Sequence, residues 1–230
     1  CCKYNFNPIL IDADFTVDLS DINTTTKTLK VYSNPSAKHT LTLVNGNNFI
    51  SSFKDIKIMH DTNNLKHITQ DGVNFDNCNI LTKDGATIVV SNINIKNCGV
   101  TASQIQCTDE YTSTDYIFSN NTWTANTIFG IVLTSATVDS LSNCVISNNR
   151  VTNTTATRTR LFLSPNIPAR NIKITDNVIY NFHASTDTPL ADGIIGAFTA
   201  VGTAAEFTLT VTGNTICSST LNTALTLGKA

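Results

Sequence analysis

The side chains of this chain that are best suited to chemistry gather in one short stretch. All four arginines lie between residues 150 and 170, and no lysine lies between Lys96 and Lys173. A guanidinium group presents a planar fork of donors that matches a carboxylate or a sulfate. We therefore expect Arg158 and Arg160 to contact an acidic ligand, together with Asp187 and Asp192 from a loop that follows.

The same stretch offers weak candidates for catalysis. Arg158, Arg160 or His183 could act as a base if its pKa were shifted toward the working pH. The simpler interpretation is that the arginines keep a surface soluble and that the loop has no ligand. Both interpretations remain open from the sequence.

A metal site is not expected. The run Asp12, Asp14, Asp18 and Asp21 is more typical of a solvated strand face, and His39, His60 and His67 are predicted to be single and without partners. The seven cysteines include no Cys-x-x-Cys pair, so zinc is not expected. Cys78 and Cys144 are predicted to be buried as small apolar side chains.

The framework that positions the arginines and the loop is expected to come from a sequence repeat of ten residues. It runs from Tyr116 to Ala125, from Cys144 to Asn153 and from Ile172 to Asn181, and its copies start at equal intervals. Ile88 to Asn97 is assigned as an earlier copy, and Leu209 to Ser218 follows after a longer interval. A fixed period of this length is the signature of a solenoid.

Alternation inside the repeat indicates strands, because its apolar residues are two apart. The break between two strands contains Asn, Asp or Gly, which tolerate the left-handed conformation of a sharp bend. Stacked bends would form an asparagine ladder in which side-chain amides bond to one another, made of Asn121, Asn149, Asn177 and Asn214. Ile93 is assigned to this position in the first copy, and Cys78 in an imperfect copy before it.

These residues resemble the right-handed parallel β-helix of the pectate-lyase-like superfamily, over about residues 50 to 230. The resemblance implies an all-β fold, a solenoid with rungs of about 28 residues, where a rung is one circuit of the chain. Members include polysaccharide lyases, hydrolases, esterases, tailspikes and adhesins, so the fold alone does not select an activity. Adjacent Asp-Asp, Asn-Thr-Asp, Gly-His-Gly and Arg-Ile-Lys motifs are absent, which speaks against the pectin-hydrolase branch.

A second strand of each rung is predicted from its distance to the ladder residue. It contains Ile131 and Leu133, then Leu161, then Ile194 to Phe198, then Leu225. This alignment places the insertion that lengthens the last rung within His183 to Gly193. With Leu161 and Leu163 pointing inward, Arg158 and Arg160 would point outward beside the inserted loop.

The chain is predicted to be one elongated domain. Residues 1–46 would form N-terminal strands or a cap, and residues 47–230 the parallel β-helix. The net charge of −2 gives no general attraction to nucleic acid. No apolar run is long enough to span a bilayer, and no leader peptide is visible at the start. Cys1 could be a lipidated residue exposed by leader removal.

Two function classes remain. The first is an extracellular or cell-surface module, non-catalytic, with a structural or glycan-binding role. The second is a polysaccharide lyase acting on an acidic, uronic-acid glycan, for which calcium would be a possible cofactor; otherwise no cofactor is expected. The expected partner is a polysaccharide or another surface protein, and self-association through the ends of the coil is possible.

Overall fold

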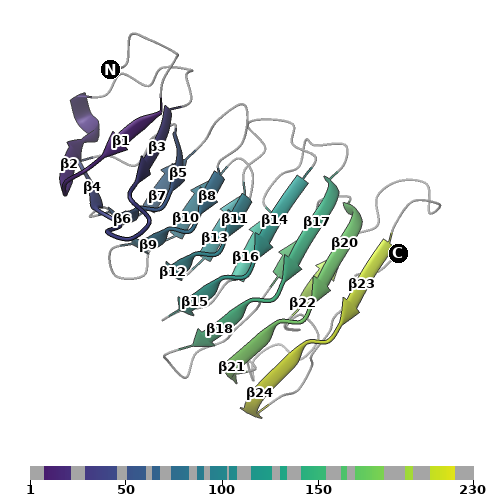
Figure 1. Ribbon diagram of the computed structural model, residues 1–230. Helices are drawn as coiled ribbons and strands as arrows, with labels where there is room; N and C mark the ends of the chain where they lie inside the picture. The colour runs from purple at the N-terminus through teal and green to yellow at the C-terminus, as the bar shows by residue number, and fades with distance from the viewer. Residues whose placement is uncertain are drawn as a thin grey trace.

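The computed structural model consists of parallel strands stacked rung upon rung (Figure 1). It describes residues 8–21, 29–45, 51–60, 64–67, 74–82, 87–90, 94–102, 104–107, 115–125, 130–133, 141–153, 162–164, 169–183, 195–198 and 208–220. Among these residues the strands form three sheets, and every described strand pair is parallel. The fold is therefore all-β and solenoid-like.

Each sheet takes one strand from successive rungs. The first sheet contains β1 (Ile9–Ile11), β3 (Leu29–Ser33), β5 (Ser51–Lys54), β8 (Asn74–Asp76), β11 (Asn94–Lys96), β14 (Asp115–Ser119), β17 (Leu141–Ser147), β20 (Ala169–Thr175) and β23 (Thr208–Thr212). The second contains β2 (Phe15–Asp18), β4 (Thr40–Val44), β6 (Lys57–His60), β9 (Asn79–Thr82), β12 (Gly99–Thr101), β15 (Thr122–Ala125), β18 (Arg150–Asn153), β21 (Val178–His183) and β24 (Thr215–Thr220). The third contains β7 (Asn64–His67), β10 (Thr87–Val90), β13 (Gln104–Cys107), β16 (Gly130–Leu133), β19 (Phe162–Ser164) and β22 (Ile195–Phe198).

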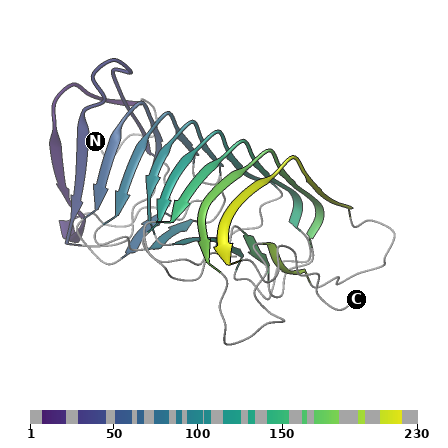
Figure 2. The ribbon, with the colours of Figure 1, turned by 90° about the horizontal axis from the view of Figure 1, so that it is seen from below.

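A sharp bend joins the first sheet to the second in each rung, and Figure 2 shows these bends as a row of arches. The bend residue has a positive φ in seven successive rungs: Asp55, Asn77, Asn97, Asn120, Asn148, Asp176 and Gly213. Asn, Asp and Gly are the residues that adopt this conformation at least cost. The predicted bend chemistry is confirmed for the copies that contain Asn120, Asn148, Asp176 and Gly213.

Gly213 offers a direct test of this bend. Its φ is 68°, and a Cβ there would overlap Asp176 Oδ1 of the preceding rung. We expect Gly213→Ala to lower the free energy of unfolding by about 1–2 kcal/mol, measured by denaturant titration. Gly99→Ala is the control, since a Cβ there would lie 3.3 Å from a side-chain atom of Asn79 and no positive φ is involved. Equal effects of the two changes would contradict the account of the bend.

The asparagine ladder is confirmed by its hydrogen bonds. The backbone N–H groups of Asn121, Asn149 and Asn177 each donate to the Oδ1 atom of the next ladder asparagine, at 2.9 to 3.0 Å. Each Nδ2 group donates to a carbonyl oxygen of an earlier rung, as Asn149 does to Phe118 at 2.8 Å. Asn121, Asn149 and Asn177 are buried, so these bonds satisfy polar groups that water cannot reach.

The register of the first expected copy, Ile88 to Asn97, is wrong. Ile88 lies in the third sheet and pairs with Ile105, whereas Asn94 pairs with Ile117 in the first sheet. The ladder position before Asn121 belongs to Cys98, whose backbone N–H donates to Asn121 Oδ1 at 2.9 Å. Ile93 lies outside the described residues.

The regular period begins only at Asn121. Asn121 and Asn149 are 28 residues apart, as are Asn149 and Asn177. Cys98 precedes Asn121 by only 23 residues, and Cys78 precedes Cys98 by 20 residues. The earlier rungs are therefore shorter, and a search for one fixed interval cannot align them.

The position of the insertion also needs correction. Val151 pairs with Ile179, Phe162 with Ile195 and Asn171 with Thr208. The sequence separation between partners grows from the first of these pairs to the second, and again from the second to the third. It thus grows on both sides of β22, so the insertion does not fall wholly within His183 to Gly193.

The third sheet contains two of the predicted second strands, at Ile131 and at Ile195–Phe198; Leu161 and Leu225 lie outside the described residues. Phe162 pairs with Ile131, in the column that contains the buried Ile88. The expected register, in which Leu161 lies opposite Leu133, is wrong, because Ile131 pairs with Phe162 and Val132 with Leu163. Arg158 and Arg160 lie outside the described residues, so the outward direction expected of them stays a prediction.

Inward side chains fill the interior of the coil. Trp123 is buried in the same column as Val151 and Ile179. Its indole Nε1 donates to the Ala102 carbonyl oxygen at 2.7 Å, and its ring meets Phe118 edge to face with centroids 5.7 Å apart. The N-terminal strands join the same sheets, since β1 pairs with β3 and β2 with β4.

Candidate functional site

The predicted ligand site is described only in part. Arg158, Arg160, Asp187 and Asp192 lie outside the described residues. His183 ends β21, and its backbone pairs with Thr220 of β24. The acidic-ligand site, and the hypothesis that it is catalytic, therefore stay predictions.

Arg150 is among the described residues. Its guanidinium carbon lies 4.5 Å from the centre of the Tyr180 ring, a cation–π contact between neighbouring strands.

A different surface, near the N-terminal rungs, is hollowed. A groove of about 650 Å³ is lined by Leu10, Ile11, Asp12, Tyr32, Ser33, Asn34, Pro35, His39, Lys54 and Asp55. Leu10 pairs with Tyr32 and Tyr32 with Lys54, so these three exposed side chains form one outward column on β1, β3 and β5. We call them the groove column. Lys30 is also exposed on β3, two residues before Tyr32.

One of the two acidic residues that line the groove, Asp55, is bonded by the protein itself. Asp55 Oδ1 accepts the Nδ2–H of Asn77 at 2.7 Å, and Lys38 Nζ donates to Asn77 Oδ1 at 2.8 Å. Asp55 is 9% exposed. Asp12, in contrast, is exposed. The groove therefore combines the groove column, which carries one exposed lysine, with one exposed carboxylate.

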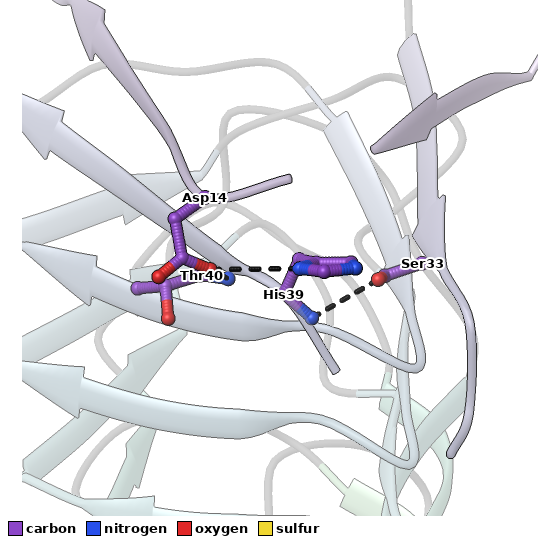
Figure 3. A network of polar contacts seen from close by, with 4 residues as sticks. All are labelled: Asp14, Ser33, His39 and Thr40. Atoms are coloured by element: carbon purple, nitrogen blue, oxygen red, sulfur yellow. Dashed lines mark hydrogen bonds and ion pairs between the residues drawn. The ribbon is translucent and has the colours of Figure 1, made fainter. Parts of the chain in front are cut away.

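A second polar cluster lies beside the groove (Figure 3). His39 Nδ1 is 3.7 Å from Asp14 Oδ1, so the expectation that His39 has no partner is wrong. The backbone N–H of Thr40 donates to the same Asp14 oxygen at 2.8 Å and lowers the pKa of that carboxyl group. Ser33 Oγ accepts the backbone N–H of His39 at 3.0 Å.

Asp14, His39 and Ser33 are residue types of a nucleophilic triad, but their geometry differs from one. The contact of Asp14 with His39 is longer than a hydrogen bond, and Ser33 is 2% exposed. The bond that Ser33 accepts comes from the His39 backbone and holds the chain after the turn at Asn34. These contacts position one wall of the groove.

Two members of the predicted run of aspartates, Asp14 and Asp18, accept hydrogen bonds from the protein. Asp18 accepts hydrogen bonds from the Ser20 hydroxyl and backbone and from Asn45, which lower the pKa of its carboxyl group. Within the described ranges, no group of three or more His, Cys, Asp or Glu side chains is arranged to hold a metal ion.

Cysteines occupy the ladder position in two rungs, and the sequence predicted only one of them, Cys78. Cys78 and Cys98, like the ladder asparagines, occupy the position after the bend in successive rungs, and both are buried. The Cys78 backbone N–H donates to Cys98 Sγ at 3.3 Å, as the Cys98 N–H donates to Asn121 Oδ1. Two thiols thus continue the ladder.

Cys144 is buried as predicted, and its burial raises the pKa of the thiol to about 12.

Comparison with protein-family models, with curated proteins and with solved structures found no match. Among the described residues, no helix has the length and apolar character required to cross a membrane. The candidate site is therefore assessed on its own geometry.

Proposed function

We propose that this chain is an extracellular or cell-surface module that binds an extended acidic glycan along the groove column without catalysing a reaction. Its architecture in this proposal is a right-handed parallel β-helix of the pectate-lyase-like kind. Its regular rungs would repeat at the interval of 28 residues that separates Asn121 from Asn149 and Asn149 from Asn177. The observation that carries the proposal is the groove of about 650 Å³ above β1, β3 and β5.

The chemistry of the groove column supports a sugar polymer. Parallel strands repeat about every 4.8 Å, so Leu10, Tyr32 and Lys54 present a row of contacts to a repeating chain. The Tyr32 ring offers an apolar face and a hydroxyl group, a combination common at binding surfaces. Lys54 and Lys30 supply positive charge for a carboxylate or sulfate on the glycan.

Binding to immobilised glycans tests this proposal. We expect uronic-acid polymers to bind more tightly than neutral ones, and Tyr32→Ala and Lys54→Ala each to weaken binding about tenfold, which corresponds to about 1.4 kcal/mol. Met59→Ala and Lys173→Ala are matched controls, since Met59 is exposed on β6 and Lys173 is exposed on β20, away from the groove. These controls are expected to bind as the native protein does.

Two results would overturn the proposal. Absence of binding to every glycan would favour a purely structural role. Growth of ultraviolet absorbance from an unsaturated product, when the protein is incubated with uronic-acid polymers, would show that it is a lyase. In that case Arg160→Ala and His183→Ala would be the first variants to assay.

A further inference from the structure

Among the described cysteines, Cys78 and Cys98 are the two that lie opposite each other in neighbouring rungs. They occupy the same position in neighbouring rungs, as the pairing of Gly99 with Asn79 requires. Adjacent strands of a sheet lie about 4.8 Å apart, within the range of about 4.4–6.8 Å between Cα atoms that a disulfide spans. The Cys78 N–H contact to Cys98 Sγ, at 3.3 Å, places the second sulfur directly against the first residue.

We propose that Cys78 and Cys98 are a redox pair that a disulfide oxidant, such as oxidised glutathione, converts into a disulfide between neighbouring rungs. One thiolate attacks a sulfur of oxidised glutathione, forming a mixed disulfide and releasing one reduced glutathione. The second thiolate then attacks the protein sulfur of the mixed disulfide and releases the other. The two cysteines lose two protons and two electrons, and the oxidant is reduced to two thiols.

The polar surroundings distinguish the two sulfurs. Cys98 Sγ also lies 3.0 Å from the Lys96 carbonyl oxygen and 3.5 Å from that of Phe75, while Cys78 Sγ lies 3.4 Å from the Asp76 carbonyl oxygen. The hydrogen bond between the thiols lowers the pKa of Cys98 and raises that of Cys78.

Burial determines when the reaction occurs. Cys78 is 0% exposed and Cys98 is 2% exposed. A glutathione molecule therefore reaches them before the rungs have stacked, or during a local opening of the coil. Oxidation is expected to be fast during refolding and slow in the folded protein.

Peptide mapping tests the proposal without any variant. The protein is refolded with oxidised and reduced glutathione, or with dithiothreitol, blocked with a maleimide and digested. We expect the oxidised sample to contain a linked peptide pair joining Cys78 to Cys98, with fragment ions that exclude Cys107 as the partner. Recovery of both thiols in the free form would overturn the proposal.

Thermal melting gives a second readout. The cross-link closes a loop of about 20 residues, so we expect the oxidised protein to melt on the order of 5–10 °C higher than the reduced protein. Cys78→Ser and Cys98→Ser are each expected to remove this difference, and Cys144→Ser to preserve it, since Cys144 pairs with Tyr116 and Ile172. A difference that persists in Cys98→Ser, or that disappears in Cys144→Ser, would contradict the assignment of the pair.

Discussion

Replacement of Asn149 by leucine is expected to lower the free energy of unfolding by roughly 2–4 kcal/mol, because each polar group stranded at a buried position costs about 1–3 kcal/mol. The Asn121 backbone N–H would lose its acceptor, and the Phe118 carbonyl oxygen would lose the Nδ2 donor. Both groups belong to buried residues. The Asn177 Oδ1 atom would also lose one of its two donors from residue 149. Denaturant titration monitored by circular dichroism measures the change.

The neighbouring asparagine provides the control for this experiment. Asn148 has a φ of 55° and an exposed side chain, so Asn148→Gly keeps the bend and removes no ladder bond. We expect its effect to stay within about 0.5 kcal/mol. If Asn149→Leu were as stable as Asn148→Gly, the ladder would have no part in holding the rungs together.

Truncation of Trp123 to alanine is expected to cost about 3–5 kcal/mol, the usual loss for a large buried aromatic side chain. Trp123 is 1% exposed and packs against the Phe118 ring. The truncation also leaves the Ala102 carbonyl oxygen without the indole N–H that reaches it at 2.7 Å. The same titration measures this loss, and the melting temperature should fall in parallel.

Two further variants separate the causes. Trp123→Phe keeps an aromatic ring beside Phe118 but removes the indole N–H, so we expect a smaller loss than for alanine. Phe15→Ala, at a side chain that is 58% exposed, should change the stability little. Equal losses for Phe15→Ala and Trp123→Ala would mean that Trp123 is not part of the core.

The sequence predicts the second half of the coil well because asparagine recurs there at the buried position after each bend. A buried amide that must bond to the rungs before and after it recurs as Asn121, Asn149 and Asn177. In the first half the rungs are shorter, and the ladder position holds Ile56, Cys78 and Cys98. These residues are all buried, but the two cysteines are 20 residues apart rather than 28, so a fixed interval assigns the ladder position to Ile93 instead.

A weaker signal in the sequence could have found the first rungs, but not the groove. In the rungs that precede the asparagine ladder along the chain, the bend residues with positive φ are Asp55, Asn77 and Asn97. Leu10, Tyr32 and Lys54 meet because β1, β3 and β5 pair, and that pairing depends on the lengths of loops whose residues follow no repeat. The arginines can be recognised in the sequence because charge is a property of the residue type. A groove depends on which distant strands pair, and the residue types alone do not show this.

The stacking of successive rungs in register, from β6 to β24, is the feature on which the whole fold depends. It can be tested by pulsed electron resonance between nitroxides at Lys57 and Thr215, introduced as non-canonical residues so that the native cysteines stay unlabelled. Both side chains are exposed and belong to one column, which runs through Asn79, Gly99, Thr122, Arg150 and Val178. Six strand spacings predict a narrow distance distribution near about 29 Å, and a broad distribution, or one centred beyond about 40 Å, would contradict the stacked coil.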